Sequence, residues 1–221
     1  HYRFSSGDAV SPAGATLTLP IGAVSAAIFA VVSCSNYPAG YFNVYREVAN
    51  ANVEAVLHLG DYIYEYAEDG YASDRAPEFG RVVEPRTELY SLEDYRTRYA
   101  QYRSDPDLQA AHAAHPFLVV WDDHEIANDG WREGAENHDP DTEGDFEARK
   151  LAAIQAWYAW APVRPPADVE EIIYRRFQYG DLLDMLMLDT RYVGREEQFT
   201  YEDFATDGMI DVAAARAGCR R

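Results

Sequence analysis

The sequence predicts an α/β fold in which parallel β-strands alternate with α-helices. Short apolar runs rich in β-branched residues alternate along the chain with segments of helical periodicity. In addition, four apolar runs each end in residues that can bind a metal ion or a phosphate group: Cys34, Asp61, the pair Asp122 and Asp123, and the pair Asp189 and Arg191. Because parallel α/β sheets bind ligands at the carboxyl ends of their strands, this second observation also predicts where a functional site lies.

Size and charge limit the classes of protein that this chain can belong to. Its 221 residues can bury one substantial core, so we expect one main domain. The 38 acidic and 19 basic side chains give a formal charge of -19, which repels nucleic-acid phosphates and anionic membranes and argues against nucleic acid as a partner. An acidic protein that handles phosphate needs cations in its site, and Asp and Glu are the oxygen ligands that hold them.

The cysteines and the apolar runs indicate neither a disulfide framework nor a membrane span. Cys34 ends an apolar run and Cys219 lies near the C-terminus, so a pairing between them is not supported. The longest apolar run, Ile21–Cys34, is too short to cross a bilayer. Its end superficially resembles a lipoprotein cleavage box, but only Arg3 supplies a basic residue before it, which disfavours a lipid anchor.

The first half of the chain reads as a linker followed by a strand, a helix and a second strand. The alternation at Thr16–Leu19 indicates a last strand before a linker. Ala27–Ser33 is a continuous apolar run typical of a buried strand, and Tyr41–Ala51 has the periodicity of a helix. Ala55–Gly60 is the second buried strand.

A long polar loop and two helices follow. Residues 67–90 form the loop, and long loops in compact domains are often functional. Ser91–Asp94 is the sequence of a capping box and predicts the start of a helix. Asp105 and Pro106 open the next helix, which ends before Pro116.

The second half repeats the alternation. Phe117–Trp121 is a third apolar strand, and Asp145 caps an amphipathic helix that extends through Trp160. Leu182–Leu188 is a fourth strand, which ends at Asp189.

The motif Gly-Asp-Tyr-Ile-Tyr at the end of the second strand carries the sharpest chemical signal. Gly60 permits a tight exit from the strand, and Asp61 then projects a carboxylate that can bridge two cations. Tyr64 reaches the same point if the chain begins a helical turn, and a phenolate ligand needs a strong Lewis acid such as Fe(III). A capped turn with a packed aromatic ring is the alternative, and the other strand ends favour the metal site.

The motif Asp-Asp-His-Glu follows the third strand directly. Asp123 offers a ligand, His124 can contact a phosphate or protonate a leaving alkoxide, and Glu125 can orient the imidazole. A helix N-terminus capped by acids is the alternative, but it leaves His124 without a role.

The other candidate site residues are judged by how close they lie to the strand ends. A thiolate at Cys34 can face the same site, although most buried cysteines act as small hydrophobic residues. We predict that Asn36, in the same loop, and Asn128, after the third strand, contact the substrate. His58 lies inside a strand and His112 near a helix end, so a structural role is expected for both.

Three segments resemble the PhoD-like alkaline phosphatases, a family of calcineurin-like metallophosphoesterases related to purple acid phosphatases. They are Ser33–Gly40 (SCSNYPAG), Leu57–Glu65 (LHLGDYIYE) and Val120–Glu125 (VWDDHE). The resemblance covers nearly all of residues 20–210. It implies an α/β/β/α metallophosphoesterase sandwich that hydrolyses phosphomonoesters and phosphodiesters, and a protein that acts outside the cell or in the periplasm. We also expect small phosphoesters as substrates and a monomer.

The resemblance also implies cofactors and residue roles. The family uses a ferric ion, Fe(3+), together with calcium, Ca(2+). The implied roles are iron ligation by Cys34 and Tyr64, bridging by Asp61, calcium ligation by Asp123, and catalysis or phosphate contact by His124.

The resemblance finally predicts how the chain is organised. Residues 1–20 correspond to the tail of a preceding β-sandwich domain with a linker, and residues 21–221 to the catalytic domain without its C-terminal part. The family's later Gly-Asp-Val-His motif does not occur in this sequence. Two hypotheses therefore stay open, an active phosphoesterase and an inactive remnant that binds metal or phosphate. A phosphatase with Asp61 or Asp123 as nucleophile ranks below both, because it gives Cys34 and Tyr64 no role.

Overall fold

The computed structural model describes residues 1–164, 173–200, 202–206 and 209–218, and its centre is a parallel three-stranded β-sheet. The strands are β3 (Phe29–Val32), β4 (Ala55–His58) and β5 (Phe117–Val119), with β4 in the middle. In register, Val32 pairs with His58, and His58 pairs with Val119. All three strands therefore end at the same edge of the sheet, as the sequence predicts.

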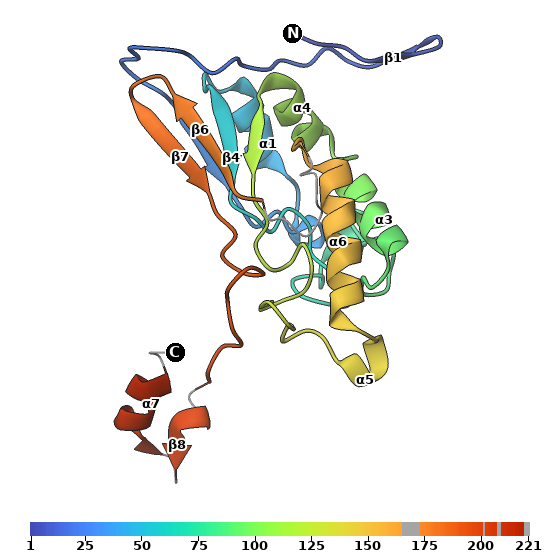
Figure 1. Cartoon of the computed structure of the whole chain (residues 1–221). Helices are drawn as coiled ribbons and strands as arrows, with labels where there is room; N and C mark the ends of the chain where they lie inside the picture. The colour runs from blue at the N-terminus through green and yellow to red at the C-terminus, as the bar shows by residue number, and fades with distance from the viewer. Residues whose placement is uncertain (165–172, 201, 207–208, 219–221) are drawn as a thin grey trace.

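An antiparallel hairpin and a layer of helices lie on opposite sides of this sheet. The hairpin consists of β6 (Arg175–Tyr179) and β7 (Leu183–Met187), to the left of the parallel sheet in Figure 1. To its right the same view shows α1 (Asn43–Asn50), α3 (Leu92–Tyr102), α4 (Pro106–Ala114) and α6 (Phe146–Trp160). Helix α1 packs against α4, and α3 packs against α6.

The predicted helix starts are confirmed by their caps. Ser91 and Asp94 form a complete capping box, in which the Asp94 carboxylate also accepts the Ser91 backbone N–H at 2.8 Å. Asp105 caps α4 by accepting the backbone N–H groups of residues 107 and 108, and Asp145 caps α6 by accepting that of residue 148. These caps satisfy backbone donors that have no partner inside a helix.

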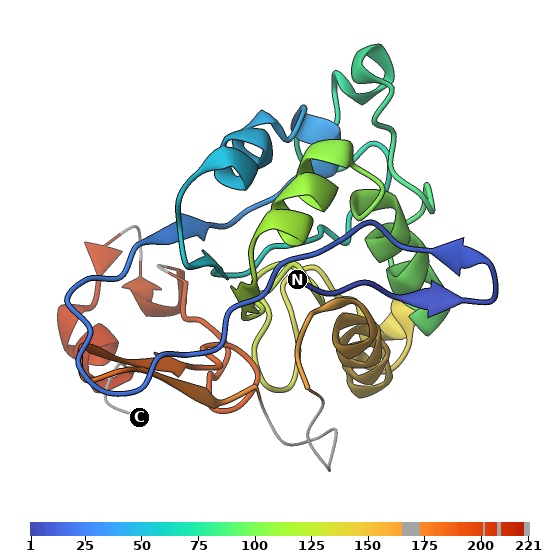
Figure 2. The same ribbon diagram turned by 90° about the horizontal axis from the view of Figure 1, so that it is seen from above.

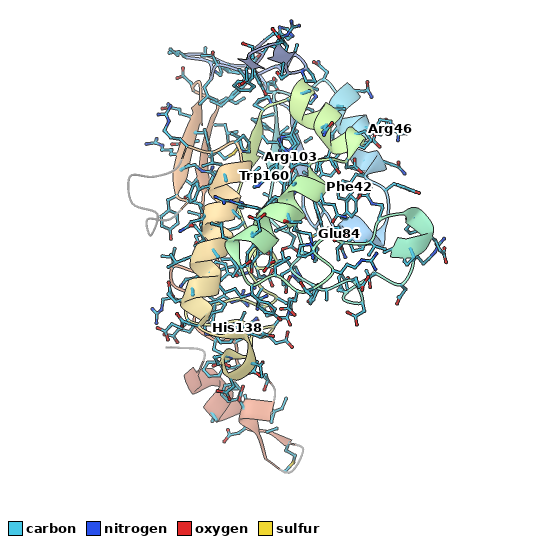
Figure 3. All side chains as sticks on the ribbon, turned by 90° about the vertical axis from the view of Figure 1, so that its right-hand side faces the viewer. Phe42, Arg46, Glu84, Arg103, His138 and Trp160 are labelled. Carbon is cyan, nitrogen blue, oxygen red and sulfur yellow. The ribbon has the colours of Figure 1, made fainter. Side chains whose placement is uncertain are left out.

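Aromatic side chains fill the interface between α3 and α6. Tyr95, Tyr99 and Tyr102 are fully or almost fully buried on one face of α3. Tyr99 lies parallel to Trp160 of α6, with 6.5 Å between the ring centroids. Figure 3 shows Trp160 near Arg103 in the middle of the helical layer, whereas His138 lies at its lower end beside the short helix α5 (Pro140–Glu143).

Two strand predictions are wrong. The structure contains no strand at Thr16–Leu19; the N-terminal segment instead forms the two-residue strands β1 (Ser5–Ser6) and β2 (Ala9–Val10) and runs across one end of the layers (Figure 2). The fourth strand exists, but it pairs antiparallel with β6, a strand that the sequence analysis missed. In β6 the exposed residues Arg176 and Gln178 alternate with more buried ones. Because the strand contains three polar residues in five, its sequence does not read as an apolar run.

Four short helices and two short strands complete the described chain. They are η1 (Tyr37–Ala39), α2 (Ala76–Phe79), η2 (Glu202–Phe204), α7 (Val212–Gly218), β8 (Ala205–Thr206) and β9 (Met209–Ile210). Figure 1 places α7 and β8 at the end of the molecule opposite the N-terminus. Cys34 is a free thiol, and Cys219 lies outside the described residues. Among the helices described, none is long and apolar enough to cross a membrane.

A cavity of about 590 Å³ lies at the amino edge of the parallel sheet. Phe29 and Phe117, at the starts of β3 and β5, line it together with His112, Tyr179 of the hairpin and Phe4. This apolar space is therefore at the edge of the sheet opposite the strand ends that the sequence marks as functional.

Two histidines are structural, as the sequence predicts. His58 is completely buried, and its Nε2 lies 3.1 Å from the hydroxyl oxygens of both Ser35 and Tyr45. His112 stacks on Phe117, and its Nε2 lies 2.8 Å from the Tyr62 hydroxyl oxygen and 2.7 Å from Arg103 Nη1. Because Arg103 only donates, the ring nitrogen of His112 must accept. Burial, followed by the charge of Arg103, holds the pKa of His112 well below its usual range.

We therefore expect the free energy of unfolding to fall as the pH drops below about 6.5. The unfolded chain then binds a proton at His112 that the folded chain does not, which costs about 1.4 kcal/mol per pH unit for each such histidine. Urea unfolding between pH 6.5 and 5 should show a shallower pH dependence for His112→Gln than for the unsubstituted chain. The exposed His1, changed to Gln, serves as control and should leave the slope unchanged. Equal slopes for all three chains would contradict this assignment.

Candidate metal centre

The loops that follow the three parallel strands bring the four predicted ligands together. The Cys34 Sγ atom lies 3.4 Å from Asp61 Oδ2, and the Tyr64 hydroxyl donates to the same oxygen at 3.2 Å. One possible ligand atom from each of Asp61, Asp123 and His124 lies within 4.8 Å of the others. Asp61 therefore has a thiol and a phenol on one side and a carboxylate and an imidazole near it as well. Their role as ligands stays a prediction.

Unusual backbone conformations direct these side chains. Cys34 and Asp61 have φ values of 58° and 54°, in the left-handed region that residues other than Gly seldom adopt. Gly60 has φ of 107°, and a Cβ atom there would collide with the Asp122 backbone nitrogen. Gly60 is thus required because the loops after β4 and β5 touch. Tyr64 reaches Asp61 through bends at residues 62 and 63, so the helical turn expected from the sequence is not formed.

Glu125 has a different role from the one predicted. It does not orient the imidazole of His124; its buried carboxylate accepts backbone N–H groups from Asp61 at 3.1 Å, Tyr62 at 2.7 Å and Asp122 at 2.9 Å. Burial raises the pKa of Glu125 to about 8, although the three N–H donors favour its charged form. Residues 124–126 form a turn and no helix begins there, so the helix N-terminus considered as the alternative for this motif is not observed.

Glu65 is the residue that orients His124. Its fully buried carboxylate lies 2.8 Å from His124 Nδ1 and also accepts the Asn128 backbone N–H at 2.7 Å and the Asn137 side-chain amide at 2.8 Å. Burial alone lowers the pKa of His124, but the hydrogen bond and charge of Glu65 outweigh it and raise this pKa to about 9. The sequence does not reveal this role of Glu65, because its partners lie about 60 to 70 residues later in the chain. Its position directly after the proposed ligand Tyr64 is the one sequence feature that places it near the site.

One atom of the cluster fits a bound cation. The Asp61 Oδ1 atom is buried and has no hydrogen-bond partner among the residues that the structure describes. Burial raises the pKa of Asp61 above its usual range, and the charges of Asp123 and Asp122 add to this effect while that of His124 opposes it, so the ionised form gains from a further cation. A thiol, a phenol, carboxylates and an imidazole are all established metal ligands, so this donor set fits a metal site.

The two predicted substrate contacts lie in different surroundings. The Asn36 amide, two residues after Cys34, donates to the Tyr71 carbonyl at 3.1 Å. The Asn128 amide turns toward Glu136 and donates to its carboxylate at 2.8 Å. Asn36 therefore lies in the Cys34 loop, whereas the Asn128 side chain is engaged with a neighbouring loop. Substrate contact stays a prediction for both.

The hairpin contributes a cation rather than another acid. Arg191, which follows β7, donates to Asp122 Oδ1 at 2.6 Å, and its Nη2 lies 3.3 Å from Asp123 Oδ1. Asp189 accepts the Trp121 indole N–H at 3.0 Å and two backbone N–H groups of its own turn. Asp122 and Asp189 thus have structural partners, and Asp123 is the acid of the third strand end that meets Asp61.

This fold and this site define an α/β protein with a candidate metal centre at the carboxyl edge of a parallel sheet. The model of the family "PhoD-like phosphatase" matches residues 29–217. The chain is 43% identical over 200 residues to alkaline phosphatase D of Bacillus subtilis (strain 168), covering 86% of this chain and 33% of that protein. A solved structure titled "Structure of PhoD" matches with a TM-score of 0.78 and 40% identity, covering 89% of this chain and 37% of that one.

The chain therefore belongs to the PhoD-like phosphatase family. The resemblance seen in the three sequence motifs is confirmed, and so is the α/β fold class of the metallophosphoesterase type. The chain spans about a third of the length of these relatives.

Arg98 fixes the loop that carries Tyr64 and Glu65. This completely buried side chain of α3 donates to the carbonyl oxygens of Tyr64, Tyr66, Glu84 and Pro85. Its partners are backbone carbonyls, so the guanidinium acts as a clamp between two loops.

Replacing Arg98 by Met should destabilise the chain by about 3 kcal/mol or more, because several buried carbonyl groups lose their donor. Urea unfolding measures this loss. The matched control is Arg96→Met, at an exposed position on the same helix, and it should change the free energy of unfolding by less than about 0.5 kcal/mol. A similar stability for both variants would show that Arg98 is not a clamp.

Proposed function

We propose that this chain carries the metal centre of an enzyme that hydrolyses phosphomonoesters and phosphodiesters of small molecules. The observation that carries the proposal is Asp61, which contacts Cys34 and Tyr64 through one oxygen and has its other oxygen buried without a partner among the described residues. Membership of the PhoD-like phosphatase family supports the same reaction class.

We propose Fe(3+) and Ca(2+) as the cations, with Cys34 and Tyr64 on iron, Asp123 on calcium and Asp61 between them. Burial, followed by the charges of Asp61 and Cys34, holds the pKa of Tyr64 far above its usual range, so a phenolate forms only beside a strongly acidic cation. Cys34 is exposed as a residue, but partial desolvation of its thiol, together with the charge of Asp61, raises the pKa of that thiol. Oxygen ligands such as Asp123 suit calcium.

The residues around the centre have separable tasks in this proposal. Bound cations would neutralise the charge of the phosphoryl oxygens and would lower the pKa of the water that acts as nucleophile. His124 is held by Glu65 through Nδ1, which leaves Nε2 for a phosphoryl oxygen or for protonation of the leaving alkoxide. Asn36 and Asn128 are proposed to donate amide hydrogens to the substrate.

The cellular setting and the chain organisation are proposed from the family. We propose that the enzyme acts outside the cell or in the periplasm, that it is a monomer, and that residues 1–20 are the tail of a preceding domain. The formal charge of -19 supports small phosphoesters over nucleic acid, because the field repels a polyanion.

The test is Asp61→Asn, which keeps the size of the side chain and removes its charge. We expect it to lower iron and calcium content more than any other single substitution, because a bridging carboxylate serves two ions. Loss of a supporting residue costs 10- to 100-fold in metal affinity, so loss of the bridge should exceed about 100-fold. Elemental analysis of the purified chain measures the metal content.

Asp184→Asn is the matched control, since Asp184 lies on the hairpin and pairs with Arg176 at the surface. It should leave the metal content unchanged. Hydrolysis of p-nitrophenyl phosphate and of bis-p-nitrophenyl phosphate, with both metals added, then tests turnover. Undiminished iron and calcium in Asp61→Asn would end the proposal, whereas metal binding without turnover would favour the remnant hypothesis.

A further inference from the structure

Three roughly parallel rings lead from the candidate metal centre to the surface. The Tyr64 and His124 rings stack with centroids 4.2 Å apart, and Tyr71 lies next to Tyr64 at 6.3 Å with an angle of 21° between the planes. Tyr64 and His124 are buried, whereas Tyr71 is 64% exposed. The line of rings therefore ends in an aromatic surface that is open to solvent beside the site.

The loop that carries Tyr71 is firmly held. Within it, the Gly70 N–H donates to the Ala67 carbonyl at 3.0 Å, and the Ser73 hydroxyl donates to the Gly70 carbonyl at 2.8 Å. The Asn36 amide ties the Tyr71 carbonyl to the loop of Cys34. Ala72 adopts φ of 58°, a conformation that side chains seldom accept. The chain thus fixes the backbone on both sides of an exposed ring.

The position of Tyr71 relates it to the organic part of a substrate. A phosphoryl group bound at Asp61 and His124 would have buried side chains on one side, which leaves the solvent side for its ester group. The Tyr71 ring stacks directly beside the Tyr64 ring, and the Tyr64 hydroxyl contacts Asp61 at 3.2 Å. An exposed aromatic face at that distance can stack on a planar group and gains little from an aliphatic one.

We propose that Tyr71 is a specificity-determining residue that stacks on a planar aromatic ester group, such as a phenyl ring or a nucleobase. The proposal rests on the proposed function, because it requires a phosphoryl group at the metal centre. Stacking of one aromatic pair corresponds to a preference of about 3- to 10-fold for an aromatic ester over an aliphatic one. The Tyr71 hydroxyl has no part in this preference.

The experiment compares the affinity of the chain, with iron and calcium added, for phenylphosphonate and methylphosphonate by titration calorimetry. Phosphonates are not hydrolysed as esters, so the readout is independent of turnover. The chain should prefer phenylphosphonate by about 3- to 10-fold, Tyr71→Phe should keep this ratio, and Tyr71→Ala should bring it close to one. Tyr174→Ala, at a tyrosine that is 51% exposed on the hairpin side, controls for loss of a surface ring.

The outcomes separate the two proposals. Binding of methylphosphonate with a phenyl preference that survives in Tyr71→Ala overturns the stacking role and leaves the proposed function intact. Loss of the phenyl preference in Tyr174→Ala as well would also overturn the stacking role, because the preference would then not depend on the ring at position 71. Failure of the unsubstituted chain to bind either phosphonate contradicts the proposed function, and with it the stacking role that depends on it.

Discussion

The buried carboxylate of Glu125 holds together the loops that leave β4 and β5, and the candidate metal centre depends on this link. It accepts the backbone N–H groups of Asp61 and Tyr62 from one loop and of Asp122 from the other. These hydrogen bonds offset the cost of the left-handed backbone at Asp61. The close contact at Gly60 follows from the same link, because the two loops can approach only where a Cβ atom is absent.

Charge compensation explains how so many acids can be buried in a chain with a formal charge of -19. Glu65 is paired with His124, and Asp122 and Asp123 share Arg191. Glu125 is surrounded by backbone donors instead of cations. Asp61 alone in this group has a buried oxygen without a partner among the described residues, which makes it the point where an external cation gains most. Tyr64 and Cys34 contact only one oxygen of Asp61, so the other oxygen of the acid that is proposed to bridge is left for a cation.

The strand ends and helix caps could be predicted because they depend on local sequence. The apolar runs locate β3, β4 and β5, and the capping box at Ser91 is formed as its residues predict. The partners of buried side chains could not be predicted in the same way. Glu65 and Glu125 are both acids near His124, and only the approach of two loops distinguishes the one that bonds the imidazole from the one that binds backbone. The antiparallel pairing of β7 likewise depends on β6, a strand that cannot be recognised from the sequence because its residues are largely polar.

The two contacts from the turn after β7 have a consequence for the order of events during folding. Arg191 bonds Asp122 across 69 residues of sequence, and Asp189 bonds the Trp121 indole across 68. Contacts of such long range carry an entropic cost of loop closure, because they join segments that are far apart in the unfolded chain. During synthesis, the ribosome must release the turn after β7 before Asp122 has its counter-charge. The counter-charge of Asp122 and Asp123 is therefore the last part of the site to be synthesised, after all four proposed ligands.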